Sequence, residues 1–198
     1  MKVGIISDIH GDYEALQTAL DRLDNQHHAD TILCAGDLIG RGPDPNQVVN
    51  CIRERSIITV RGNHDEWIYD SLTKVNRDFL TNLPLEWREE FVGIRLYMCH
   101  GKPGNNIWGL YEAHASSTLL NLMLGSLAVD VFVTGHTHVP MFVSVDKGCV
   151  VNPGSLYTMH TSRATSHTYG VLSLPQITFD LFDITKKDLM PVMQASVA

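Results

Sequence analysis

The fold of this chain is decided by the stretch Val3-Gly4-Ile5-Ile6-Ser7-Asp8-Ile9-His10-Gly11, an apolar run that ends at two metal-ligand side chains. Side chains alternate between the two faces of a strand, so Asp8 and His10 point the same way if the backbone stays extended beyond Ser7. Open α/β sheets place their sites at the carboxyl ends of their strands. The alternative is that Asp8 only caps the following helix and that His10 has no functional partner.

Length and composition favour one globular domain. The 198 residues are 44% hydrophobic, which is enough for one substantial core. We therefore expect residues 1–198 to form a single domain with a small helical insertion at about residues 66–90. The formal net charge of -7, without a cluster of Lys or Arg, disfavours a nucleic-acid partner.

The cysteines and the apolar runs indicate the compartment. The cysteines lie apart in apolar surroundings, without the spacing of a zinc site: Cys34, Cys51, Cys99 and Cys149. We expect them to be reduced. The chain begins directly with a strand and has no apolar run of the roughly 18 residues that a membrane span needs. We expect a cytoplasmic protein without a membrane partner, and a homo-oligomer remains open.

Strands and helices alternate in the first third of the chain. The predicted elements are a helix over residues 12–25, a strand over 31–35, a helix beginning at Asp44-Pro45 and a strand over 57–60. The two later strands end in polar residues, at Asp37 and at Arg61-Gly62-Asn63-His64-Asp65. Alternation of this kind predicts parallel pairing, which brings the strand ends to one edge of the sheet.

The remainder of the chain predicts a second sheet. After the insertion, the predicted elements are a strand over residues 94–99, a helix over 111–124, a strand over 131–134 and antiparallel strands over 142–145, 149–152, 169–174 and 177–184. The second half therefore looks like a sheet packed on the first. We predict an α/β fold, a four-layer αββα sandwich of two mixed β-sheets flanked by helices. The insertion covers the sheet edge or walls a substrate pocket.

Seven potential metal ligands lie just beyond predicted strands: Asp8, His10, Asp37, Asn63, His100, His136 and His138. Imidazole together with carboxylate suits Mn, Fe, Co, Ni or Zn better than calcium or magnesium alone. Seven ligands are too many for one tetrahedral ion, so the set predicts two divalent ions that share a bridging carboxylate.

These motifs carry a resemblance. In their order D-x-H, G-D, G-N-H-D, H-G and G-H-T-H, they resemble the calcineurin-like metallophosphoesterase superfamily, and Asn152-Pro153-Gly154-Ser155 resembles its small bacterial and archaeal phosphodiesterase branch. The resemblance runs from Lys2 to about Ser155. It implies three ligands for a first metal ion (Asp8, His10 and His138), three for a second (Asn63, His100 and His136), a bridging Asp37 and a substrate-facing His64 that binds no metal.

Arg41 is a second candidate for contact with substrate. The stretch Gly36-Asp37-Leu38-Ile39-Gly40-Arg41-Gly42 is similar to the G-D-x-x-D-R-G signature of phosphoprotein phosphatases and diadenosine tetraphosphatases, whose arginine binds phosphate. This chain has Gly40 where that signature has the acid that pairs with the histidine matching His64. Asp65 is an alternative partner for His64.

The resemblance implies a dimetal-dependent phosphoesterase that hydrolyses small phosphodiesters, and also phosphomonoesters as an open possibility, by in-line attack of a metal-bridging hydroxide. Manganese is the first expectation for the metal, with Fe, Ni, Co or Zn as alternatives. The other functions left open are a serine/threonine-phosphatase-like or diadenosine tetraphosphatase-like enzyme and a non-catalytic scaffold of the same fold. The loop over residues 157–168 either lines the pocket or only connects strands. His27 and His28 are assigned to solvated surface.

Overall fold

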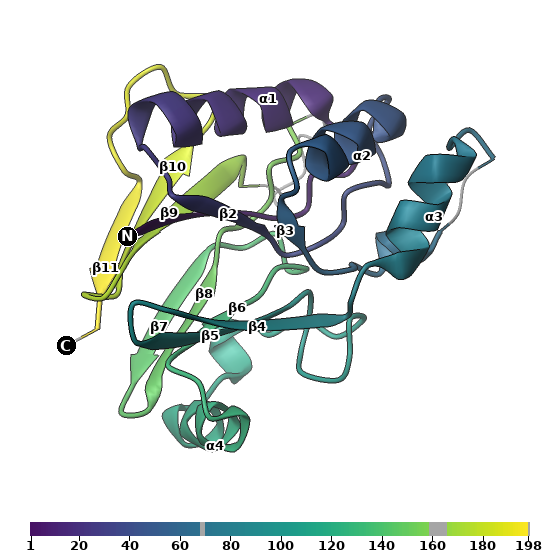
Figure 1. Ribbon diagram of the computed structural model, residues 1–198. Coiled ribbons are helices and arrows are strands. Elements are labelled where there is room, and N and C mark those ends of the chain that lie inside the picture. Colours follow the sequence, from purple (N-terminus) through teal and green to yellow (C-terminus); the bar gives the residue numbers. More distant parts are fainter. Residues whose placement is uncertain (68–69, 159–165, 198) are drawn as a thin grey trace.

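Two β-sheets face each other and helices cover their outer surfaces. The computed structural model describes residues 1–67, 70–158 and 166–197. Figure 1 shows α1 and α2 above one sheet and α4 below the other. The prediction of an αββα sandwich of two mixed sheets is confirmed. The prediction of a single domain over the whole chain stays a prediction.

The first sheet has six strands in the order β11-β10-β9-β1-β2-β3. Their bounds are Lys2–Ile6 for β1, Thr31–Cys34 for β2, Ile58–Thr59 for β3, Thr168–Ser173 for β9, Thr178–Asp183 for β10 and Met193–Ser196 for β11. Strands β1, β2 and β3 pair in parallel, whereas β9 pairs antiparallel with both β1 and β10. The carboxyl ends of the first three strands therefore meet at one edge, as the sequence predicts.

The second sheet has five strands in the order β4-β5-β6-β8-β7. Their bounds are Glu86–Phe91 for β4, Ile94–Cys99 for β5, Val131–Val133 for β6, Met141–Val145 for β7 and Gly148–Asn152 for β8. Strands β5, β6 and β8 are parallel, and β4 and β7 pair antiparallel at the two edges.

The helices begin where local signals place them. Their bounds are Tyr13–Asp21 for α1, Pro45–Glu54 for α2, Lys74–Asn82 for α3 and Ser117–Leu127 for α4, with short turns η1 at Arg22–Gln26, η2 at His64–Glu66 and η3 at Glu112–His114. The Asp12 carboxylate caps α1 by accepting the backbone N–H of Ala15 at 3.0 Å. Pro45 occupies the first turn of α2, where its missing N–H costs nothing.

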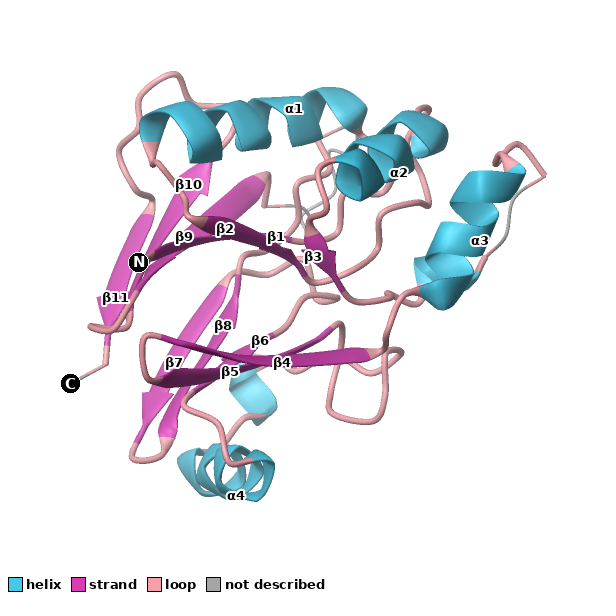
Figure 2. Cartoon of the chain, in the orientation of Figure 1, coloured by secondary structure: helices cyan, strands magenta, loops and turns pink. Residues whose placement is uncertain are grey.

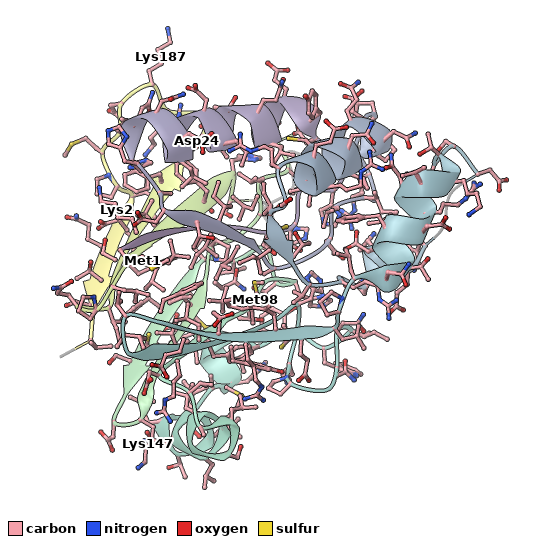
Figure 3. All side chains as sticks on the ribbon, in the orientation of Figure 1. Met1, Lys2, Asp24, Met98, Lys147 and Lys187 are labelled. Carbon is pink, nitrogen blue, oxygen red and sulfur yellow. The ribbon has the colours of Figure 1, made fainter. Side chains whose placement is uncertain are left out.

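Three apolar layers hold the sandwich together. Val3 and Ile5 of β1 lie in the core between the sheets, whereas Ile6, on the opposite face of β1, lies in the core beneath α1 and α2. Met98 belongs to the core between the sheets and lies there in Figure 3. A third core packs α4 against the outer face of the second sheet. Both faces of each central strand are thus buried, which fixes the strand positions at the site.

Two predictions about elements were wrong. The stretch over residues 66–90 is not helical throughout: its helix is α3, and β4 follows, pairing antiparallel with β5. Trp87 and Phe91 of β4 lie on the core between the sheets, while the charged residues between them face water and protect an edge strand. The helix expected over residues 111–124 begins only at Ser117, because Ser116 caps it by accepting the N–H of Leu119.

The assignment of the C-terminal strands also needs correction. Strands β9 and β10 were expected in the second sheet, but they extend the first sheet beside β1, and β11 adds a further strand that the sequence did not predict. The pairing of β1 with β9 joins residues about 170 positions apart, so it depends on tertiary packing and cannot be predicted from local sequence patterns. No helix in the described part of the chain is both long and apolar enough to cross a bilayer.

Candidate metal centre

All seven predicted ligands lie just past the carboxyl ends of strands. Asp8 and His10 follow β1, Asp37 follows β2, and Asn63 follows β3. The other three come from the second sheet: His100 after β5, and His136 and His138 after β6. Figure 2 shows these strands running into loops rather than directly into helices. The loops of both sheets therefore supply side chains to one place between them.

The backbone at the ligands differs from the extended chain on which the D-x-H prediction depended. Five of the seven have left-handed backbone angles: φ is 53° at Asp8, 52° at His10, 56° at Asp37, 68° at His136 and 59° at His138. Such angles are uncommon outside glycine and cluster at functional sites, where the surrounding structure enforces them. The paired ligands converge because each chain curls tightly after its strand, and not because side chains alternate along an extended segment.

The first cluster consists of Asp8, His10 and His138. The Nε2 atoms of the two imidazoles lie 3.0 Å apart, and Asp8 Oδ1 lies 3.2 Å from His138 Nε2 and 3.9 Å from His10 Nε2. Donor atoms bound to one transition-metal ion at about 2.1 Å lie about 3 Å from one another. These donor atoms form one group with the spacing that a metal ion requires.

The second cluster consists of Asn63, His100 and His136. Asn63 Oδ1 lies 2.9 Å from His136 Nδ1 and 3.1 Å from His100 Nε2. The two imidazole nitrogens lie 3.2 Å from each other. All three pairs of donor atoms are thus in contact, again at the spacing that ligands of one ion adopt.

Asp37 lies between the clusters. Its Oδ2 atom is 3.8 Å from His10 Nε2 in the first cluster and 3.4 Å from His100 Nε2 in the second. Its Oδ1 atom accepts the backbone N–H of His64 at 2.8 Å, which fixes the rotation of the carboxylate. Oδ2 is therefore free to serve both clusters, as a bridging ligand does.

Two further observations indicate that the donor set is suited to metal ions. Asp8 Oδ1 is buried and has no hydrogen-bond partner among the described residues, although it points at the first cluster. The far ring nitrogens of two histidines face backbone carbonyls, His100 Nδ1 at 2.7 Å from Ala35 O and His10 Nδ1 at 3.3 Å from Ile39 O. A carbonyl only accepts, so Nδ1 carries a proton in both rings, and Nε2 is the nitrogen that faces the cluster and could bind a metal ion.

Electrostatics within the site favour ionised carboxylates. Burial by itself would raise the pKa of Asp8, but the surrounding imidazoles, first among them His138, hold it well below its usual range. Burial would lower the pKa of His100, but the Asp37 carboxylate raises it to about 10. Burial lowers the pKa of His10 to about 4. Asp8 is thus held ionised and His10 neutral, which are the forms that bind metal ions, whereas His100 is held protonated by Asp37.

Asp65 does not pair with His64, contrary to the alternative raised from the sequence. Its buried carboxylate accepts four backbone N–H groups: Asp37 and Gly62 at 2.9 Å, Leu38 at 2.8 Å and Ile39 at 3.2 Å. Burial, aided by the nearby Asp37 charge, raises the pKa of Asp65 to about 7. Asp65 therefore binds the loop that carries Asp37 to the loop that carries Asn63.

Two residues of the Asn152-Pro153-Gly154-Ser155 stretch also hold the ligand loops. The Asn152 side chain donates to Gly135 O at 2.8 Å and to Thr137 Oγ1 at 3.1 Å, on either side of His136. The Ser155 hydroxyl donates to the backbone carbonyl of Asp8 at 2.8 Å. The Asn-Pro-Gly-Ser stretch was the sequence signal for them, because Asn and Ser are the side chains that bond to backbone groups in tight turns.

His64 and Arg41 lie at the open side of the clusters. The His64 ring is half-buried against His10, with centroids 4.7 Å apart, and its Nδ1 has no hydrogen-bond partner among the described residues. Burial lowers the pKa of His64; the Asp37 carboxylate opposes this, and the positive charge of the exposed Arg41 lowers the pKa further. One ring nitrogen of His64 also lies within 4.8 Å of the donor atoms of His10 and Asp37, so proximity alone does not tell whether His64 is a metal ligand or a proton donor.

Gly40 explains why the phosphatase acid is missing. Its φ is 152°, a conformation that side chains rarely adopt, and an added Cβ would lie 2.7 Å from His10 Nδ1 and 3.1 Å from His64 Nδ1. An acid at this position would have to displace one of the two rings. The close packing of Gly40 against the His10 and His64 rings thus leaves no room for a side chain at this position.

The loop over residues 157–168 lies near the centre at both of its described ends. Tyr157 packs its ring edge-on to His10, with centroids 5.8 Å apart, and Thr158 donates to the Asp12 carboxylate. His167 Nδ1 lies 2.8 Å from Tyr157 O. His160 and Arg163, which the sequence analysis included in this loop, lie outside the described residues.

The sequence matches a known family over most of its length. The sequence profile of the calcineurin-like phosphoesterase superfamily domain matches residues 1–176. Two proteins of Methanocaldococcus jannaschii are similar: the uncharacterized protein MJ0912 is 27% identical over 176 residues, covering 78% of this chain and 70% of that protein. Phosphodiesterase MJ0936 is 26% identical over 167 residues, covering 78% of this chain and 83% of that protein.

A solved structure shares the fold. The hypothetical protein PH1004 from Pyrococcus horikoshii OT3 superposes with a TM-score of 0.80 at 16% sequence identity, over 92% of this chain and 87% of that one. At this identity the likeness concerns the arrangement of sheets and helices. It agrees with two mixed sheets that bring their strand ends together.

Proposed function

Because the chain belongs to the calcineurin-like phosphoesterase superfamily, we propose that it is a dimetal-dependent phosphoesterase that hydrolyses small phosphodiesters, with phosphomonoesters as a second substrate class. The observation that carries the proposal is the position of Asp37 Oδ2, 3.8 Å from His10 Nε2 and 3.4 Å from His100 Nε2. One carboxylate oxygen between two groups of converging donors is what a pair of ions requires. The similarity to phosphodiesterase MJ0936 favours the diesters.

Six of the seven donors divide into two sets of three, and Asp37 lies between the two sets. Asp8, His10 and His138 would hold one ion, and Asn63, His100 and His136 the other. When bound, two divalent ions polarise a phosphate oxygen and lower the pKa of a water so that it attacks phosphorus at neutral pH. The set contains only two carboxylates, Asp8 and Asp37, so two divalent cations leave a positive site that attracts phosphate.

His64 and Arg41 complete the proposed chemistry. His64 lies beside the first cluster without needing to join it. In its protonated form, which the negative charge of a bound phosphate favours, it would donate a proton to the leaving oxygen as the P–O bond breaks. Arg41 is exposed, and its positive charge acts to lower the pKa of both His64 and His138. A guanidinium there would bind the phosphate oxygens that face away from the metal ions.

Hydrolysis of p-nitrophenyl esters tests the proposal. The wild-type protein with Mn²⁺ should hydrolyse bis-p-nitrophenyl phosphate, and a chelator should abolish the reaction. Asp37→Ala should be inactive while its circular dichroism spectrum stays that of the wild type. Rates on mono- and bis-p-nitrophenyl phosphate, measured side by side, decide between a phosphatase-like and a phosphodiesterase enzyme. A wild-type protein that is inactive with Mn²⁺ would instead favour a non-catalytic scaffold.

The remaining parts of the proposal concern the ion and the setting of the protein. We propose manganese as the ion, with Fe, Ni, Co or Zn as alternatives that the same donors accept. Metal analysis of protein purified without added metal tests this. We also propose a cytoplasmic protein that acts on small phosphate esters rather than on nucleic acid, since its net charge is -7. A homo-oligomer remains open, and sedimentation velocity decides it.

A further inference from the structure

Two of the three tryptophans are largely exposed to solvent. Trp67 is 53% exposed and Trp108 is 68% exposed, whereas Trp87 lies half-buried in β4. Ile107, next to Trp108, is 61% exposed. Large apolar side chains that gather on a surface mark a place where something else binds.

Trp67 lies directly against the site. It follows the η2 turn, where its backbone N–H donates to His64 O at 3.0 Å. Its ring centroid is 4.1 Å from that of His64, with the ring planes at 51°. One part of the indole thus covers the proposed proton donor, and the rest remains open to solvent.

The loop that carries Trp108 is bonded to the same turn. Asn106 Nδ2 donates to Glu66 Oε1 at 2.8 Å. The loop just before Ile107 and Trp108 is therefore bonded to the residue that precedes Trp67. Asn105 Oδ1 accepts the N–H groups of both Ile107 and Trp108 at 2.9 Å. The exposed side chains therefore project from a backbone that is hydrogen-bonded in place.

The same loop then reaches the second cluster. A Cβ added to Gly109 would lie 2.8 Å from His136 Cδ2 and 2.7 Å from Thr137 Cγ2, so Gly109 packs directly on the His136 ring. Ile107 and Trp108 thus lie in the segment that runs from the Glu66 contact to the His136 contact. Together with Trp67 they border the metal centre; we name these three residues the apolar rim.

We infer that the apolar rim binds a planar ring carried by the phosphate ester, either a nucleoside base or an aryl group. This inference rests on the proposed function, because the phosphate at the metal centre brings the ring to the rim. Indole stacks on any planar π system, and stacking on aromatic side chains stabilises nucleic-acid bases without reading their identity. Trp67 contacts His64, and Gly109, next to Trp108, packs on His136. This proximity to the metal centre favours a group attached to the substrate over a separate partner.

Calorimetric binding of phosphonates tests the inference without hydrolysis, since a P–C bond is not an ester. Two pairs are matched in charge: phenylphosphonate with cyclohexylphosphonate, and the phosphonate analogue of adenosine 5′-monophosphate with that of ribose 5-phosphate. In the presence of Mn²⁺, at least one ring-bearing member should bind about fivefold or more tightly than its partner. The pair that shows the preference tells whether the ring is an aryl group or a base.

Variants locate the preference. Trp67→Ala and Trp108→Ala should bring the ratio within each pair close to one, and Trp67→Phe should keep most of it. Trp87→Ala is the matched control, because Trp87 packs between the sheets, and it should leave the ratio unchanged. Equal affinities within both pairs for the wild type, or an equal loss in Trp87→Ala, would overturn the inference. Hydrolysis of bis-p-nitrophenyl phosphate by the same preparation reports separately on the proposed function.

Discussion

The Nε2 atoms of His10 and His138 lie 3.0 Å apart although 128 residues separate them in the chain. One imidazole comes from the first sheet and the other from the second, so their contact exists only when the two sheets are packed face to face. His100 repeats the pattern, since its Nδ1 bonds to Ala35 O of the opposite sheet at 2.7 Å. Proper packing of the sandwich and assembly of the site are therefore one event.

Asp65→Asn should weaken both the fold and metal binding. An amide offers one oxygen to four backbone N–H groups and turns its own NH₂ towards donors, so we expect a loss of about 2–4 kcal/mol in unfolding free energy. Urea unfolding at pH 8, where the carboxylate is ionised, measures the first effect, and Mn²⁺ titration measures the second. Asp78→Asn, which breaks an exposed pair with Lys74, is the control and should cost less than about 1 kcal/mol.

His64→Asn should slow hydrolysis without releasing metal. Loss of a positioned proton donor typically costs about 10²–10⁴ in kcat, and the cost should be greater for an alkyl ester than for a p-nitrophenyl ester, whose leaving group needs no proton. Steady-state rates on both esters and metal content per chain provide the measurement. A fall in bound metal to half would show instead that His64 is a ligand, as its distance to His10 and Asp37 permits.

Arg41→Gln should raise KM and leave kcat nearly unchanged. A charged hydrogen bond to a phosphate oxygen is worth about 1.5–3 kcal/mol, so KM should rise about 10- to 100-fold for a dianionic monoester and less for a diester. Arg41→Lys keeps the charge but loses the bidentate contact, so its KM should lie between those of the wild type and Arg41→Gln. An unchanged KM for both ester classes would remove Arg41 from the substrate site.

His27 should make the stability depend on pH, which corrects its assignment to solvated surface. Its Nε2 lies 2.9 Å from the Tyr169 hydroxyl and its ring packs 4.3 Å from that of Phe182. Burial lowers its pKa, and Lys2, Arg22 and the neighbouring His28 act in the same direction, with only Asp180 opposing them.

The folded protein thus favours neutral His27, whereas the unfolded chain takes up a proton below its ordinary pKa of about 6.5. The contribution of His27 to stability is complete above that pH and decreases as the pH falls through it. Melting temperatures of the wild type and of His27→Gln should therefore converge between pH 7.5 and pH 5.5. A difference between the two melting temperatures that stays constant over this pH range would contradict the prediction.

Local sequence signals correctly predicted that the candidate ligands lie at the carboxyl ends of the strands. Apolar runs followed by Asp, Asn or His predicted where β1, β2, β3, β5 and β6 end, because burial on both faces of a central strand demands a continuous apolar run. The helical spacing after Asp12 and the Asp44-Pro45 pair predicted where α1 and α2 begin, although the Asp44 side chain makes no capping hydrogen bond. These features depend on residues a few positions apart, so the sequence alone reveals them.

Tertiary packing decided what the sequence left open. The edge strand β4 forms because β5 offers it a partner, and β9 to β11 extend the first sheet because β1 has a free edge there. Asp65 binds four N–H groups, and five ligands adopt left-handed angles, only because distant loops hold them there.

The sequence by itself therefore determined which side chains this protein can offer to metal ions and phosphate, and at which strand ends. Only the folded sandwich decided that they meet, with Asp37 between the two clusters, because donors far apart in the chain acquire their spacing from the packing of two sheets.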